Sequence, residues 1–216
     1  MNSTPACASP TPPLPAAAPR RATPRMAGLR LLRLHSASRR APAAIAAIAG
    51  CAVALRVVLQ HHWGAQAQQA PLVIEAATAT IIAATIRSPF GETERATGRL
   101  LPYLRLGLGL ALTAIAVASL AAGSSGAHLP GGDLELLRNL AGLVGIGLVS
   151  APLFGAYAWV GPITYAIVAE YAVGADWTSP WMWPGRPPHD PAAALCATLI
   201  FVVGLAVIAA RGPRDQ

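Results

Sequence analysis

Six apolar runs, each close to the length of a membrane-crossing helix, constrain this chain more than any other feature. A helix that crosses the hydrocarbon core of a bilayer needs about 20 mostly apolar residues. One apolar stretch, residues 134–174, is too long for a single crossing, and Pro152 and Gly155 near its middle predict a tight connection there. The six predicted spans are therefore residues 42–59, 71–86, 104–122, 134–152, 156–174 and 192–210.

The composition agrees with a membrane protein and argues against an ordinary soluble enzyme. Of the 216 residues, 54% are hydrophobic and 12% are charged, whereas about a quarter of the residues in a soluble domain are charged. We therefore predict an all-α fold, with a six-span helical membrane domain over residues 41–211. All 16 basic residues are arginines. Together with the many alanines, glycines and prolines, this bias is typical of a GC-rich genome, so we expect a bacterial cytoplasmic membrane.

The distribution of arginine predicts the orientation of the bundle. Loops 60–70 and 123–133 contain no arginine and segment 175–191 contains only Arg186, whereas segment 87–105 contains four. Two more follow the last run, and seven precede the first: Arg20, Arg21, Arg25, Arg30, Arg33, Arg39 and Arg40. Cytoplasmic loops carry the excess of basic residues, so both termini are predicted to be cytoplasmic. Because these charges flank apolar runs, the predicted partner is the lipid bilayer and not a nucleic acid.

The segments outside the membrane domain differ in composition. Residues 1–25 are rich in proline and alanine and are predicted to be a disordered tail; translation starts at Met1 or at Met26. Residues 26–40 form a basic juxtamembrane segment, either a helix lying on the membrane surface or a plain flank that orients the first span. Residues 212–216 are a short cytoplasmic tail. A cleaved signal peptide ending near Ala67 is an alternative for the first run, but Arg56 inside that run argues against it.

Four ionisable residues inside the predicted spans are candidates for function, because such groups are costly in a membrane. Arg56, Glu75, Arg138 and Glu170 all lie near the outer ends of their spans. They are predicted either to pair across helices at one depth or to line an outward-facing cavity. The alternative is that each side chain reaches the interface separately.

The chain contains no motif that indicates a catalytic, cofactor or metal site of its own. There is no phosphate-binding loop, HExxH, GxSxG or CxxC motif, so we predict that the protein is not an enzyme and holds no cofactor or metal. Cys7, Cys51 and Cys196 have no metal spacing, and the latter two are read as small apolar fillers. Glycines in 106–110 and 142–147 are predicted to allow close helix packing.

Three further segments, taken in their order along the chain, resemble the arrangement in a known family. The basic segment 26–40, the charged loop 87–105 and the tryptophan- and proline-rich segment 175–191 occur before span one, between spans two and three, and before span six. In this order they resemble the six-span permease subunits of ATP-binding-cassette exporters. The string RSPFGETERATGRLLPYLRLG is also similar to sequences of actinobacterial membrane proteins.

The resemblance implies a permease that works with a separate cytoplasmic ATPase and forms a homodimer. It also implies that the loop between spans two and three docks on the ATPase, which makes Glu92, Glu94 and Arg95 the docking candidates. Two alternatives remain open at this point. One is a non-catalytic scaffold or accessory protein, and the other is an intramembrane enzyme acting on lipid, for which Glu75 and Glu170 are the available carboxylates.

Overall fold

The computed structural model describes residues 41–61, 65–86, 101–126, 132–172 and 179–211. Across these ranges the chain is helical and forms no strand, which confirms the all-α prediction. The predictions for the tail 1–25, the segment 26–40 and the tail 212–216 lie outside the described residues, and so do those for Glu92, Glu94 and Arg95.

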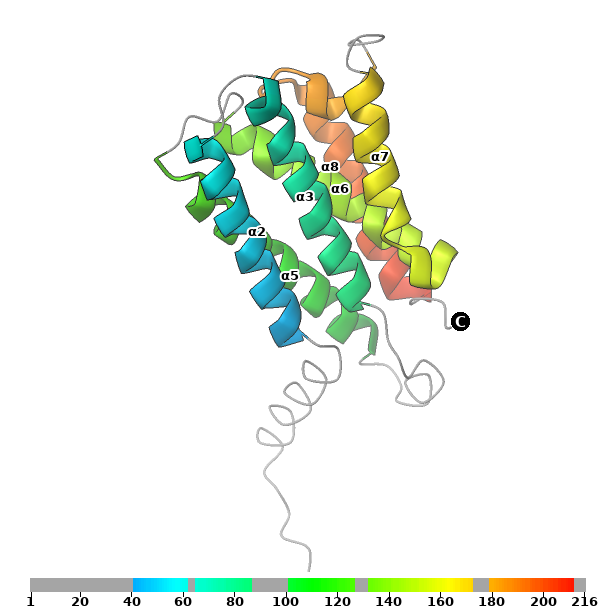
Figure 1. Cartoon of the computed structure of the whole chain (residues 1–216). Helices are drawn as coiled ribbons and strands as arrows, with labels where there is room; N and C mark the ends of the chain where they lie inside the picture. Colours follow the sequence, from blue (N-terminus) through cyan, green and yellow to red (C-terminus); the bar gives the residue numbers. More distant parts are fainter. Residues whose placement is uncertain (1–40, 62–64, 87–100, 127–131, 173–178, 212–216) are drawn as a thin grey trace, which may run out of the picture.

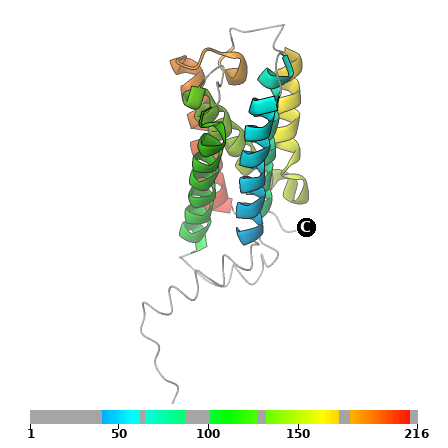
Figure 2. The ribbon, with the colours of Figure 1, turned by 60° about the vertical axis from the view of Figure 1, so that its left-hand side comes forward.

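Six α-helices lie side by side and alternate in direction along the described chain (Figure 1). Their bounds are α2 (Ala41–His61), α3 (Ala65–Ile86), α5 (Leu101–Ser124), α6 (Gly132–Phe154), α7 (Val160–Ala172) and α8 (Pro191–Arg211). Figure 2 shows from the side that the helix ends gather at two levels. Each predicted apolar run therefore corresponds to one helix of an up-and-down bundle.

Five of these helices are long and apolar enough to cross a membrane. The candidate spans cover Ala41–His61, Gln69–Ile86, Tyr103–Ser124, Gly132–Tyr157 and Pro191–Ala210. Helix α7 has 13 described residues and is about 20 Å long at 1.5 Å per residue, which is less than the hydrocarbon thickness of about 30 Å. Among the described residues there are thus five candidate spans and a sixth, shorter helix, α7, that packs on α3 and α6.

The connection between α6 and α7 lies close to the predicted position but slightly later. Helix α6 continues through Pro152 to Phe154, and the 3-10 turn η1 (Gly155–Tyr157) follows it. Gly155 has a φ of 52°, which is a left-handed conformation that glycine adopts without steric cost. The reversal therefore depends on Gly155 rather than on Pro152.

Helix α6 is the central element of the bundle. It contacts α8, α3, α7 and α5, whereas α2 packs mainly on α5 and α3. In the most apolar window of α6, 61% of residues are buried, against 22% in α2 and in α8. The outer helices therefore present most of their apolar side chains outward, as expected for helices in contact with lipid.

Glycines bring the backbones of α6 and α8 into contact. A Cβ atom added to Gly145 would lie 2.6 Å from the backbone nitrogen of Phe201, and one added to Gly204 would lie 2.7 Å from the Gly145 carbonyl oxygen. The predicted role of the glycines in 142–147 in close helix packing is therefore confirmed at Gly145. Gly107 differs, because a Cβ there would have no atom within 4 Å.

Large aromatic side chains mark both ends of the apolar outer surface. Tyr103 at the start of α5 and Tyr157 and Trp159 between α6 and α7 are exposed, and Figure 1 shows these parts of the chain at the end where α2 begins. Tyr171 at the end of α7 and Trp181 in the segment before α8 are exposed as well, and these parts lie at the opposite end. Tyrosine and tryptophan are enriched at the two interfaces of a membrane. Together with the long apolar helices, this arrangement indicates a membrane-embedded protein.

Candidate functional site: a polar cluster beneath the cap

A group of buried polar side chains lies on two neighbouring helices, with Glu75 at the middle of α3 and Arg138 and Asn139 in the second turn of α6. Glu75 of α3 is 3% exposed, and Arg138 and Asn139 of α6 are each 5% exposed. The segment 179–190, which we call the cap, leads into α8. Polar side chains are costly to bury among apolar helices unless they have hydrogen-bond partners, so these three side chains are expected to make polar contacts.

Arg138 joins α6 to the cap. Its Nη1 donates a hydrogen bond to the carbonyl oxygen of Pro187 at 2.7 Å, and its Nη2 donates to that of Arg186 at 3.0 Å. The planar guanidinium group suits such a two-pronged contact, which an ammonium group does not reproduce. Arg138 therefore fixes the position of the cap over the polar cluster.

Asn139 connects the two carboxyl groups of the cluster. Its side chain is within hydrogen-bonding reach of both Glu75 and Glu135, and Arg138 lies near enough to both carboxyl groups to attract them. Within the described part of the chain, Glu75 Oε2 and Asn139 Oδ1 are buried without a hydrogen-bond partner. The cluster thus contains two buried acceptor atoms that its protein groups leave unsatisfied.

Aromatic packing closes the cap from the side. The Trp183 ring stacks on the Tyr165 ring of α7, with centroids 4.5 Å apart and 20° between the planes. The Tyr165 hydroxyl donates a hydrogen bond to the Trp181 carbonyl oxygen at 2.6 Å. A Cβ on Gly142 would overlap the Trp183 indole at Cζ2, so the absence of a side chain at Gly142 makes room for the indole.

Asp190 ends the cap and begins α8. Its Oδ1 accepts hydrogen bonds from the backbone N–H groups of Ala192 at 2.9 Å and Ala193 at 3.3 Å, and its Oδ2 lies 2.5 Å from Arg186 Nε. This is the arrangement of a helix N-cap followed by proline at the first helical position. Desolvation opposes ionisation of Asp190, but these amides and Arg186 together hold its pKa below the ordinary value.

Replacement of Asp190 by alanine is expected to lower the thermal unfolding midpoint near neutral pH. Because the pKa of Asp190 is depressed in the folded state, its stabilising effect is complete above the unfolded pKa of about 4 and is lost as the pH falls through the lower folded value. Thermal unfolding of wild type and Asp190→Ala in detergent across pH 3 to 7 measures this. A difference in midpoint that stays constant down to the lowest pH would contradict the assignment.

The structure brings together some of the residues singled out from the sequence and separates others. Glu75 and Arg138 belong to one cluster, as described above. Glu170 lies on α7 and lines a groove between α7 and α3, and Arg56 is exposed on α2. The described residues therefore do not bring all four groups together in a single layer.

Sequence reasoning missed three members of the site. Glu135 and Asn139 are four residues apart on α6, which places them on one helix face together with Arg138, and that spacing was the available signal. Tyr165 has no comparable signal, because its partner is a backbone carbonyl in a distant segment.

The described residues contain no group of three or more histidine, cysteine, aspartate or glutamate side chains arranged to hold a metal ion. Cys51 and Cys196 are free thiols and are half-buried.

Comparison with known proteins gives no relative for this chain: no family model, no curated protein and no solved structure matches it.

Proposed function

We propose that this protein is the permease subunit of an ATP-driven exporter in a bacterial cytoplasmic membrane. It is not itself an enzyme, and it works with a separate cytoplasmic ATPase, as a homodimer. In this proposal all six helices cross the membrane, with α7 as a short span, and both termini are cytoplasmic. The end of the bundle that carries the cap then faces outward.

The polar cluster is the observation that supports this function best. Ionisable groups inside a membrane domain face the interior of the bundle and are typical of transport pathways. Glu75 and Arg138 meet this description, since both are buried and belong to two packed helices, and the amide of Asn139 is buried beside them.

The placement of the arginine-rich segments supports the orientation. Residue 41 begins α2, residue 86 ends α3, residue 101 begins α5 and residue 211 ends α8, and these four helix ends lie together in Figure 1. The three arginine-rich segments join the chain at these points. By the positive-inside rule this end is cytoplasmic.

Helix α3 supplies a physical route from the ATPase to the cluster. It is 22 residues long and extends about 33 Å as an α-helix. One of its ends leads into segment 87–100, the proposed docking loop, and Glu75 lies in its other half. Force on the loop would therefore shift α3 against α6 and change the contacts around Asn139.

Reversal of charge in the docking loop tests the proposal. Glu94→Lys is expected to reduce recovery of the ATPase by about tenfold when the tagged protein is purified from its native host in mild detergent, because like charges then face each other at the contact. The control is Asp133→Lys, the same change at the exposed start of α6 and at the opposite end of the bundle. If no nucleotide-binding ATPase copurifies with wild type, or if both variants recover it equally, the proposal fails.

A second function, that of a membrane scaffold or accessory protein, is favoured by one observation. Exposed apolar side chains recur at helical spacing along α8, at Leu195, Leu199, Val202 and Val203, and such a stripe suits another membrane helix as well as lipid. Recovery of other membrane proteins without an ATPase in the same purification would support this alternative.

A further inference from the structure

A groove opens between α3 and α7 on the outer surface of the bundle. Its volume is about 650 Å³, which is within the range of sites for small ligands. Small side chains on both helices create the space, namely Ala76 and Ala77 on α3 and Ala166 on α7, and Val73 and Ile167 flank it. Val73 is 58% exposed and Ile167 is 51% exposed, so the groove is accessible from the lipid phase.

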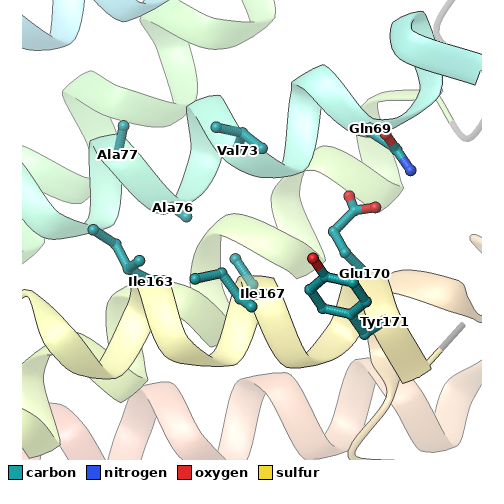
Figure 3. A pocket seen from close by; sticks show the side chains of 9 residues that line it. Gln69, Val73, Ala76, Ala77, Ile163, Ile167, Glu170 and Tyr171 are labelled. Atoms are coloured by element: carbon teal, nitrogen blue, oxygen red, sulfur yellow. The ribbon is translucent and has the colours of Figure 1, made fainter.

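Polar groups gather at one end of this groove. Figure 3 shows the Glu170 carboxylate pointing into the space between the helices, with Gln69 across from it on α3 and Tyr171 beside it. Glu170 is half-buried, and the described part of the chain places no cationic side chain in the lining of the groove. The groove is therefore apolar along its length and negatively charged at its outer end.

These features select one class of ligand. The groove extends over residues 69–77 of α3, or about 12 Å of helix, which suits a single alkyl chain. A carboxylate in surroundings of low dielectric constant attracts a cation strongly, and the face of the Tyr171 ring is an additional partner for an ammonium group. Anionic headgroups are repelled by the same carboxylate.

We propose that the groove between α3 and α7 binds a single-chain amphiphile with a cationic amine or ammonium head, which Glu170 recognises. The alkyl chain lies along the alanine floor, and Gln69 orients the head. The further statement that the exporter transports this class of ligand rests on the proposed function. Binding itself is measured without an ATPase, so a failure of this binding site can be distinguished from a failure of the proposed exporter function.

Binding of radiolabelled dodecyltrimethylammonium to the full chain in phosphatidylcholine nanodiscs tests the site, with empty nanodiscs subtracted. The expected result is one saturable site per chain, for which dodecyl sulfate does not compete. Glu170→Gln keeps the shape but removes the charge, and it is expected to weaken binding at least about tenfold, because the cationic head loses its electrostatic attraction to the carboxylate.

A second variant tests the groove itself. Ala77→Phe fills the space from an exposed position on α3 and is expected to abolish binding, whereas Ala54→Phe adds the same bulk to the exposed face of α2 and leaves binding unchanged. Binding that does not saturate would overturn the proposal, and so would unchanged affinity in Glu170→Gln. Loss of binding in Ala77→Phe with full binding in Glu170→Gln would also overturn the proposal, because the groove would then bind the alkyl chain without recognising the cationic head.

Discussion

Replacement of Gly145 by leucine is expected to destabilise the bundle by about 3 kcal/mol, since overpacking of a close contact forces its neighbours apart. The contact is between backbones: a Cβ at Gly145 would lie 2.6 Å from the nitrogen and 2.7 Å from the Cα of Phe201 on α8. No side-chain rotation relieves this clash, so the axes of α6 and α8 must separate. Loss of the monodisperse peak in detergent gel filtration, together with a lower unfolding midpoint, measures the effect.

The matched control is Gly107→Leu on α5. Gly107 is exposed, and a Cβ there meets no atom within 4 Å. Leucine is also a better helix former than glycine, so this variant is expected to be as stable as wild type or slightly more stable. Equal loss of stability in both variants would mean that α6 and α8 do not pack through Gly145.

Replacement of Arg138 by leucine is expected to cost about 3 kcal/mol, the lower end of the range for breaking a buried charged contact. The change leaves the carbonyl oxygens of Pro187 and Arg186 without their donor and removes the positive charge next to Glu75 and Glu135. The cap then loses its link to α6. The unfolding midpoint in detergent and the rate of proteolysis within the cap measure this.

Two variants calibrate this result. Arg138→Lys keeps the charge but not the planar fork, and it is expected to recover only part of the lost stability. Arg56→Leu removes an exposed arginine from α2 and is expected to change the midpoint little. If Arg56→Leu were as damaging as Arg138→Leu, the described separation of the two residues would be wrong.

The helices could be predicted from the sequence because each apolar run has the length that a membrane imposes. The boundary near Pro152 was harder to place, since proline marks a possible break whereas the chain reverses at Gly155, where φ is 52°. The short length of α7 was not predicted either. The η1 turn occupies residues 155–157, of which residue 155 was predicted to belong to the connection and residues 156 and 157 to the start of the fifth span.

The site was less accessible to sequence reasoning, for two physical reasons. Apolar runs fix how deep a residue lies but not which way its helix is rotated, so depth suggested Arg56 and Glu170 together with Glu75 and Arg138. In addition, the partners of Arg138 are carbonyl oxygens 48 and 49 residues away. Every residue has a carbonyl group, so the sequence offers no mark that distinguishes these two.

The arrangement of six crossings is tested most directly by labelling single cysteines in a background without Cys7, Cys51 and Cys196. Cysteine is placed at the exposed positions Ser125, Tyr157 and His189 and treated in intact cells with a membrane-impermeant maleimide. We predict that positions 125 and 189 react from outside, and that position 157 reacts only after the membrane is permeabilised. Reaction of positions 125 and 189 from opposite faces would contradict the account, because α6 and α7 together would then cross the membrane an odd number of times.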